Sequence, residues 1–435
     1  MTAQNVVLVA RRPQNNSFCF RVRYNDHIGL SQLLAERRLH ANSLVLDARY
    51  HERHGALRDD ALKSGIKVCL DTQSMELALP ISRSIDHNQL PWAGQDAQRP
   101  EVFTTAYQKK FINAVVTFAC QGGYSSLLAP AHYLSANDSP WLEIDGNLVS
   151  LARRMLDDAG ANNMAIVYPL ALHGDVLYNA ESRDRVIRHL KTLPIDGVSL
   201  RINRFGASAG PLVMRRIIDA CSELQALQVP LTLERGGFSS IAAFAMGAID
   251  CVESGIVFGD SFVGEGSQIL EQNKSARFAL PKRVYVESLG MTLKLDVANQ
   301  LMKSSHGKLR FACNNRDCCP NGASDMLRDA HRHSALARQR QYAELAAIPK
   351  SSRANHFIQE MLASVCDALS HASDVHEPLR TIHRRILSVK ETLRDLYNDR
   401  KDDLLSPEKA HERTRALPLA KVIPIHSSDP IGPQP

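Results

Sequence analysis

The chain has 435 residues, 44% hydrophobic and 23% charged, which is typical of a globular protein with one large domain and a smaller one. Its first residues are polar, its nine cysteines are odd in number, and no apolar run approaches the ~18 residues that span a bilayer. We therefore expect a cytoplasmic protein without disulfides or membrane segments. The net charge of +6 permits a polyanionic partner but does not by itself indicate a nucleic-acid-binding domain.

Short apolar or β-branched runs alternate with longer stretches of helical periodicity up to about residue 260. The expected strands are 6–9, 43–47, 66–71, 126–129, 164–168, 197–202, 229–234 and 249–253. The expected crossover helices are 103–121, 142–159, 180–193, 210–227 and 239–246. Eight strands alternating with helices predict a parallel (β/α)8 TIM-like barrel. The competing open sheet lacks its usual Gly-x-Gly-x-x-Gly turn after every strand.

The pattern changes after the predicted barrel. Two short runs at 283–287 and 291–295 predict a hairpin, and helical sequence follows from Asp329. The expected divisions are a barrel over 1–265, an insert with a Cys/His subdomain over 266–365, C-terminal helices over 366–405, and a disordered tail over 406–435.

A short heptad-like seam runs along the last predicted helix, following Pro378. Its apolar positions alternate at spacings of three and four: Leu379, Ile382, Ile386, Val389, Leu393 and Leu396. This pattern indicates either a helix packed on the barrel or a seam for a homodimer or partner protein.

Three of the nine cysteines lie within seven residues, at Cys313, Cys318 and Cys319. Thiolates suit zinc, and a structural zinc site takes four ligands from two nearby segments. His331, His333 and His356 lie downstream in helical sequence and could supply the fourth ligand. The alternative is a group of reduced thiols near a turn.

Polar residues follow the predicted strands, where barrel enzymes hold their catalytic groups. They are Asp47, Asp71, His132, Tyr168, His173, Arg201, Asn203, Arg204, Glu234, Arg235, Asp250 and Glu253. Guanidinium groups suit phosphates or planar bases, and a Gly-Gly pair lets a ligand approach the backbone. The candidate substrate contacts are thus Tyr168, Arg201, Arg204, Glu234, Arg235, Gly236 and Gly237. The arginines could instead be solvated or paired with neighbouring carboxylates.

The order of these elements resembles the tRNA-guanine transglycosylase superfamily, including the paralogues that insert 7-deazaguanine bases into DNA. The resemblance rests on Gly247-Ala-Ile-Asp250-Cys-Val-Glu253, on Val68-Cys-Leu-Asp71-Thr-Gln-Ser74, and on the cysteine cluster followed by a helical histidine. It covers roughly residues 40–365 and implies a barrel with a C-terminal zinc subdomain that exchanges a guanine-type base in nucleic acid.

The resemblance also implies roles for particular residues. Glu253 takes the nucleophile position, with Asp250 beside it in the motif, and Asp71 handles protons. Cys313, Cys318, Cys319 and His356 would hold the zinc ion. Independently of any family, a carboxylate can displace a base from C1′ if a second group protonates the leaving base.

Two other functions remain open from the sequence. The chain could be a catalytically inactive barrel that binds nucleic acid or assembles a complex, or an unrelated barrel lyase or aldolase acting on a phosphorylated small molecule. The basic stretches 328–340 and 380–390 could contact a DNA or RNA backbone, or could be solvated helix faces.

Overall fold

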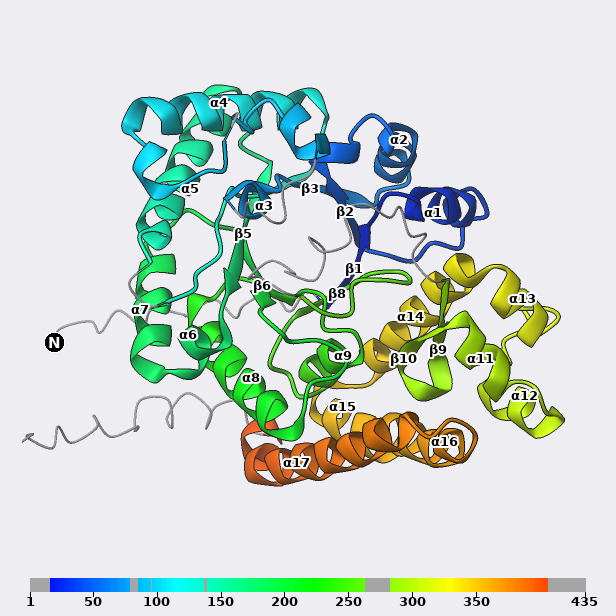
Figure 1. The fold of residues 1–435 in the computed structure, drawn as a ribbon. Helices are drawn as coiled ribbons and strands as arrows, with labels where there is room; N and C mark the ends of the chain where they lie inside the picture. Colours follow the sequence, from blue (N-terminus) through cyan, green and yellow to red (C-terminus); the bar gives the residue numbers. More distant parts are fainter. Residues whose placement is uncertain (1–15, 79–84, 95, 137–138, 263–281, 406–435) are drawn as a thin grey trace, which may run out of the picture.

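The computed structural model describes residues 16–78, 85–94, 96–136, 139–262 and 282–405. Eight parallel strands close into a barrel in the order β1 to β8, which confirms the predicted (β/α)8 fold (Figure 1). The strands are β1 Ser17–Val22, β2 Ser43–Asp47, β3 Lys67–Asp71, β4 Ser126–Leu128, β5 Ala165–Leu172, β6 Gly197–Ile202, β7 Leu231–Leu233 and β8 Cys251–Ser254.

Helices surround the barrel between successive strands (Figure 1). They are α1 Asp26–Ala35, α2 Gly55–Lys63, α3 Ser74–Ala78, α4 Thr105–Gln121, α5 Trp141–Asp158, α6 Gly174–Tyr178, α7 Ala180–Leu190, α8 Pro211–Leu224 and α9 Phe238–Ala245. The five crossover helices expected from periodicity correspond to α4, α5, α7, α8 and α9. Their apolar stripes cover the outer face of the barrel, as expected for amphipathic crossover helices.

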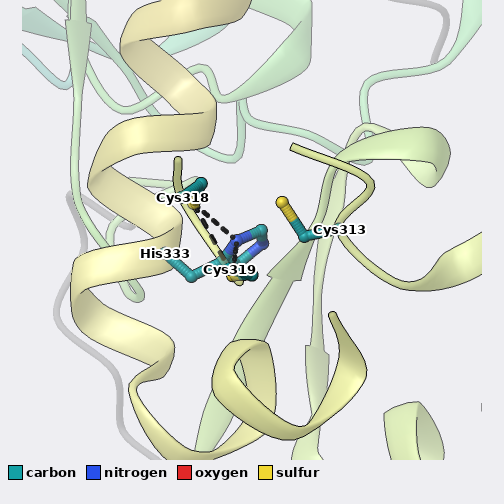
Figure 2. A group of neighbouring side chains, drawn as sticks. All are labelled: Cys313, Cys318, Cys319 and His333. Atoms are coloured by element: carbon teal, nitrogen blue, oxygen red, sulfur yellow. Dashed lines mark hydrogen bonds between the residues drawn. The ribbon is translucent and has the colours of Figure 1, made fainter. Parts of the chain in front are cut away.

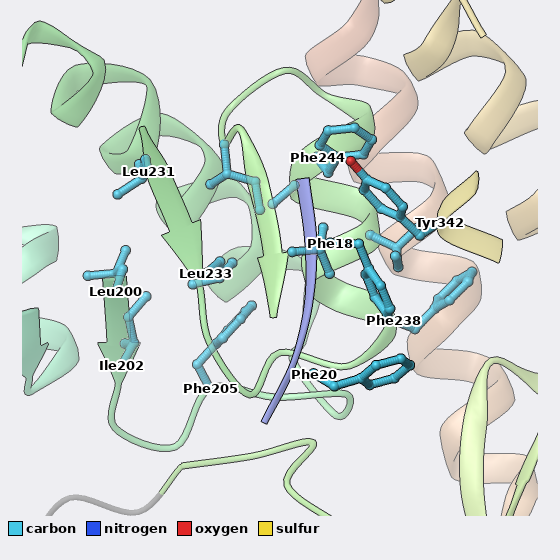
Figure 3. Packing of buried hydrophobic residues seen from close by; sticks show 14 of the residues in the cluster. Phe18, Phe20, Leu200, Ile202, Phe205, Leu231, Leu233, Phe238, Phe244 and Tyr342 are labelled. Carbon is cyan, nitrogen blue, oxygen red and sulfur yellow. The ribbon is translucent and has the colours of Figure 1, made fainter. Parts of the chain in front are cut away.

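The strand that closes the barrel is β1, which pairs with both β2 and β8. It is not among the predicted strands, and the strand predicted at 6–9 lies outside the described residues. In β1, Phe18 and Phe20 face outward into the core beneath the helices (Figure 3). Cys19 and Arg21 alternate with them and face the barrel interior. β1 has the sequence Ser-Phe-Cys-Phe-Arg-Val and carries a buried arginine on its inner face, as β6 does with Arg201.

The C-terminal region packs against the barrel beside β1 and α9. It contains the predicted hairpin, formed by β9 Arg283–Val286 and β10 Met291–Lys294. Its helices are α11 Leu295–Leu301, α12 Ser305–Phe311, α13 Ala323–Arg328, α14 Ala330–Ala347, α15 Lys350–His356, a π-helical turn Phe357–Met361, α16 Leu362–Val375 and α17 Leu379–Leu405. Tyr342 of α14 stacks on Phe18, with ring centroids 5.1 Å apart, and fixes this region to the barrel wall (Figure 3).

The apolar seam of α17 packs within the chain. Leu379, Val389, Leu393 and Leu396 are all buried, and the helix lies along α8 and α16 (Figure 1). Of the two interpretations of this seam, the structure therefore shows the helix packed on its own chain. The predicted tail, 406–435, lies outside the described residues.

Candidate active site and metal centre

The carboxyl half of the barrel interior is filled by charged side chains. Nearer the amino ends of the strands, the interior holds a small apolar layer of Cys19, Val45, Cys69 and Leu128. Above it lie five buried ionisable residues from five strands or their ends, which we call the barrel charge cluster: Arg21, Asp71, Arg201, Glu234 and Glu253. Since catalytic groups of (β/α)8 barrels collect at the carboxyl ends of strands, this cluster is the candidate active site.

Arg21 is the centre of the cluster. Its Nε donates to Glu253 Oε1 at 2.7 Å, and its Nη2 donates to Glu253 Oε2 at 2.9 Å, which is a bidentate contact. The same Nη2 donates to Glu234 Oε2 at 2.8 Å, and Nη1 donates to Asp71 Oδ2. One guanidinium group therefore holds three carboxylates from three different strand ends.

Arg201 is the second cation of the cluster. It donates through Nε to Glu234 Oε2 and through Nη2 to Asp71 Oδ2 at 3.1 Å. Ser199, two residues earlier on β6, donates to Glu234 Oε1 at 2.5 Å. Glu234 and Asp71 are thus each shared by both guanidinium groups, which binds opposite sides of the barrel together.

The carboxylates differ in how much hydrogen-bonding capacity they retain. A carboxylate has roughly four acceptor sites. Glu234 accepts two bonds on each oxygen, and Asp71 accepts two on Oδ2 and one on Oδ1, the last from the Gln73 amide. Glu253 accepts one bond on each oxygen. Glu234 is therefore saturated, whereas Glu253 keeps acceptor capacity on both oxygens.

The pKa values separate the carboxylates in the same way. Burial alone would raise the pKa of Asp71 and of Glu234, but the two guanidinium groups hold the Asp71 pKa well below its ordinary value and that of Glu234 at about 2. For Glu253 burial prevails, and its pKa is raised despite the contact with Arg21. Asp71 and Glu234 are fixed anions, whereas Glu253 is the carboxylate of this group that can gain a proton most readily.

Two further residues lie at the edge of the cluster. Glu76 on α3 places Oε1 3.9 Å from Arg201 Nη1, and its Oε2 is buried with no hydrogen-bond partner. Burial raises its pKa, with Arg201 opposing. Arg235, directly after Glu234, has a buried Nε that also lacks a partner, and burial lowers its pKa to about 10. These are an acid and a cation with unused hydrogen-bonding groups.

The structure places two of the predicted site residues away from the cluster. Tyr168 is fully buried in the main hydrophobic core. Asp250 precedes β8 and accepts a bond from the Leu231 amide at 2.9 Å, so it lies at the amino ends of the strands. Sequence spacing brings Asp250 within three residues of Glu253, but β8 separates the two carboxylates along the barrel axis.

Three of the predicted substrate contacts, Arg204, Gly236 and Gly237, have other surroundings than the cluster. Arg204 is exposed and has a left-handed backbone with φ of 59°. A Cβ on Gly236 would lie 2.0 Å from the Ser240 hydroxyl, and one on Gly237 would lie 3.1 Å from Asp260. The two glycines therefore make room for the protein's own side chains, which accounts for them without a ligand.

The second candidate centre is a buried group of Cys313, Cys318, Cys319 and His333 (Figure 2). Their ligand atoms all lie within 4.8 Å of one another. His333 Nδ1 is 3.4 Å from Cys318 Sγ and 3.5 Å from Cys319 Sγ, and the two sulfurs are 3.7 Å apart. A tetrahedron with Zn–S bonds of about 2.3 Å has S–S edges of about 3.8 Å, so the group could hold a zinc ion.

The local structure explains how both adjacent cysteines join this group. The amides of Cys318 and Cys319 both donate to the Asn315 carbonyl, at 3.1 and 2.8 Å, and the resulting turn brings their side chains together. His333 Nε2 lies 2.9 Å from the Tyr285 carbonyl on β9. That contact orients the ring so that Nδ1 faces the thiols, as in other histidine metal ligands.

His356, the predicted fourth ligand, is not in this group. It ends α15, and its Nε2 lies 3.4 Å from Glu344 Oε1. His333 takes its place because the first turns of α14 pack directly against the cysteine turn and β9 (Figure 2). His333 is one of the three downstream histidines in helical sequence, whereas the family resemblance implies the more distal His356.

The basic run 328–340 is largely engaged within the chain. Arg332 pairs with Glu36 at 2.7 Å, Arg338 with Asp260 at 2.6 Å, and Arg340 with Glu287. Arg338 also donates to the Ile256 carbonyl at 3.1 Å, which ties α14 to the segment after β8. Arg332 and Arg338 fix α14 to the barrel and Arg340 fixes it to the β9–β10 hairpin, so these arginines are poorly placed to contact a nucleic-acid backbone.

No family model matches the chain, and no curated protein matches it. Among solved structures it is similar to an endo-1,4-beta-xylanase of Penicillium canescens, with 14% identity, TM-score 0.38, and coverage of 55% of this chain and 83% of the xylanase. It is also similar to the YdjI aldolase of Escherichia coli K12, with 12% identity, TM-score 0.33, and coverage of 77% and 91%. Such low identities and TM-scores carry no argument about activity. None of the described helices is long and apolar enough to cross a bilayer.

We expect the purified protein to contain about one zinc ion per chain, measured by elemental analysis. Cys313→Ser and His333→Asn should each lose most of the metal, because each removes one of four ligands. His356→Asn is the matched control and should retain it. A wild-type protein with less than about half an equivalent of zinc, or a His333→Asn variant with a full equivalent, would contradict the assignment.

We expect Glu234→Gln to destabilise the protein by about 3–5 kcal/mol at neutral pH, because it removes one of the two carboxylates that the buried Arg21 and Arg201 share. The lowered pKa of Glu234 stabilises the fold above about pH 4.5, and this stabilisation is lost as the pH falls toward about 2. The raised pKa values of Glu76 and Glu253 act in the opposite sense in both proteins. The variant's free energy of unfolding should thus fall less steeply over this acid range.

Chemical denaturation at a series of pH values measures both effects. The matched control is Asp59→Asn, which breaks the exposed ion pair with Arg58 and should change stability by less than about 1 kcal/mol. Equal effects of the two substitutions would show that the barrel charge cluster does not stabilise the fold.

Proposed function

We propose that the chain is a transglycosylase-like enzyme that exchanges a guanine or 7-deazaguanine type base in DNA or RNA at the carboxyl end of the barrel. The observation that carries the proposal is the barrel charge cluster, in which carboxylates with opposed pKa shifts share one buried site. Base exchange needs such a division, with one carboxylate attacking C1′ and another group carrying a proton.

Glu253 is the proposed nucleophile. The bidentate contact with Arg21 fixes its orientation and favours its ionised form, and each oxygen keeps acceptor capacity. In the first step one oxygen bonds to the sugar C1′ as the C1′–N bond to the departing base breaks. In the second step the incoming base displaces Glu253 and restores the glycosidic bond, so that the enzyme is regenerated.

The proton carrier in this proposal is Glu76, in place of Asp71. Asp71 is held as an anion by two guanidinium groups, which makes it a poor proton donor. Glu76 has a raised pKa and a buried oxygen without a partner. It gives its proton to the leaving base and takes one from the incoming base, while Asp71 positions Arg21 and Arg201.

Arg235 completes the proposed site as a binding group. Its Nε is buried without a partner, and its lowered pKa of about 10 leaves it charged at neutral pH. A guanidinium group with an unused Nε donor suits a carbonyl oxygen of a purine-type base.

A second candidate function is a catalytically inactive barrel that binds nucleic acid. The observation that favours it is the contact of both Glu253 oxygens with Arg21, since a carboxylate held in this way is a weaker nucleophile. The two functions differ in whether the protein exchanges a base or only binds the polymer.

We expect the wild-type protein to incorporate labelled guanine or a labelled 7-deazaguanine into a guanine-containing DNA or RNA. Glu253→Gln should reduce incorporation by at least about 100-fold, because an amide cannot displace the base. Asp250→Asn, the same chemical change at the opposite end of β8, is the control and should exchange normally. Binding of nucleic acid without incorporation would support the inactive barrel, and normal exchange by Glu253→Gln would rule out the nucleophile.

We expect the dependence of kcat/KM on pH to be bell-shaped. Activity should rise as Glu253 ionises and fall as Glu76 loses its proton, and both limbs should lie above pH 4.5 because both pKa values are raised. Glu76→Gln should lower activity by about 10²- to 10⁴-fold, and its residual activity should lack the falling limb. Glu76→Asp, which still carries a proton, should keep both limbs. An unchanged falling limb in Glu76→Gln would exclude Glu76 as the proton carrier.

A further inference from the structure

Two neighbouring loops at the carboxyl end of the barrel carry a contiguous set of arginine and tyrosine side chains. The loop after β1 provides Tyr24, and the segment after β2 provides Arg49, Tyr50 and Arg53. The Arg53 guanidinium lies 3.9 Å from the Tyr24 ring centroid, and Arg49 lies 4.9 Å from the Tyr50 centroid. The two tyrosine rings meet edge to face, with centroids 5.1 Å apart and planes at 75°. We call Arg53, Tyr24, Tyr50 and Arg49 the Arg–Tyr stack.

Hydrogen bonds fix the position of Arg53, the exposed arginine of this group. Arg53 Nε donates to the Tyr24 carbonyl at 2.9 Å, and Nη2 donates to Asn25 Oδ1 at 3.0 Å. At the other end, Arg49 Nε donates to Asp47 Oδ1 at 3.0 Å. Both guanidinium planes are therefore fixed before any ligand binds, which reduces the entropy lost on binding.

The outer part of the stack is exposed and positively charged. Tyr24 is 50% exposed, and Arg53 is exposed. Among the described residues, Arg53 donates only to uncharged oxygens, so its charge is not neutralised by a carboxylate. The nearby Asp26 is buried and lies 3.2 Å from His331 Nδ1, which directs this acid away from the stack.

Buried aromatic side chains support the stack from below. His54 is fully buried, with its ring 5.7 Å from Tyr50 and 5.1 Å from His27. Burial lowers the pKa of His54 to about 4, so this ring is neutral and packs as an aromatic group. These rings meet edge to face or tilted, and the packed aromatic group leaves the Tyr24 ring half-exposed. An exposed aromatic ring on a rigid support can bind a planar partner.

We propose that the Arg–Tyr stack binds unpaired nucleotides of a DNA or RNA substrate and guides them to the barrel charge cluster, an inference that rests on the proposed function. Aromatic and guanidinium planes stack on bases, and the exposed charge of Arg53 attracts the phosphates. A duplex keeps its base faces covered, so the stack selects single strands, loops or extruded bases. Its place at the carboxyl ends of β1 and β2 puts the bound strand on the same end of the barrel as Glu253.

The test measures the affinity of the full chain for a fluorescent single-stranded oligonucleotide and for a hairpin duplex of the same sequence. The wild type should prefer the single strand. Tyr24→Ala should weaken single-strand binding by about 5- to 100-fold, whereas Tyr24→Phe, which keeps the ring, should bind as the wild type does. Arg53→Gln should reduce the slope of log affinity against log salt by about 0.7.

Arg216→Gln is the matched control, because Arg216 is an exposed arginine 5.4 Å from the Tyr178 ring on a different part of the surface. It should leave both the affinity and the salt slope unchanged. Thermal unfolding of each variant confirms that it is folded.

The outcomes separate this proposal from the proposed function. Wild-type base exchange together with normal single-strand binding by Tyr24→Ala would overturn the stack and leave the function standing. Stack-dependent binding without base exchange would support the stack and overturn the function. Equal affinity for single strand and duplex, or equal competition by polyglutamate, would overturn the stack as a nucleotide-binding surface.

Discussion

The structure depends on one shared cation. Arg21 contacts three carboxylates inside a closed barrel, where removal from water costs each ion several kcal/mol. That cost is offset only because the guanidinium donors and carboxylate acceptors meet in nearly complete hydrogen bonding. The barrel can therefore close in the observed register only if the Arg21 side chain points into the interior. A shift of β1 by one residue would turn Phe20 inward and place the Arg21 guanidinium in the apolar core outside the barrel.

This arrangement of two arginines also gives the carboxylates of the cluster different roles. Two arginines cannot pair equally with every carboxylate. Arg21 and Arg201 both contact Glu234, and both contact Asp71. Glu253 shares only Arg21, and Glu76 has only a long contact with Arg201. The groups that hold the site together are thus different from those whose protonation can change, which is the arrangement that acid–base chemistry requires.

Local periodicity was sufficient to predict seven of the barrel strands, the hairpin and five of the helices between the strands, because each has an apolar face of its own. It did not identify α1, α2, α3 and α6. It also did not identify β1, because the apolar run 6–9 already supplied an eighth strand to the predicted barrel. The same limit applies to the site. The positions of Asp71, Arg201, Glu234 and Glu253 at strand ends were sufficient to identify them as candidates. Arg21 and Glu76 were not identified. Only the closed barrel shows that Arg21 contacts Glu234 and Glu253, which lie more than 200 residues away in the sequence. The histidine of the cysteine group depended likewise on how α14 packs, which spacing along the chain does not determine.

The positions of strained backbone support the assignment of the candidate active site to the carboxyl end of the barrel. Five non-glycine residues in the described part of the chain have a positive φ, a conformation that costs roughly 1–2 kcal/mol each. Arg37 and Gln228 follow helical segments, where such a residue is an ordinary terminator. Gln73, Arg204 and Arg235 instead lie just beyond the carboxyl ends of β3, β6 and β7.

Contacts at the mouth hold two of these three residues in place. The Gln73 amide donates to Asp71 Oδ1 at 3.0 Å, and the Arg204 amide donates to the Phe262 carbonyl at 2.8 Å. At Arg235 the same backbone conformation directs a guanidinium toward the cluster although its Nε finds no partner there. At Arg235, the strained backbone and the buried Nε donor without a partner both reduce stability. Such a combination is typical of a side chain that is positioned to bind a ligand.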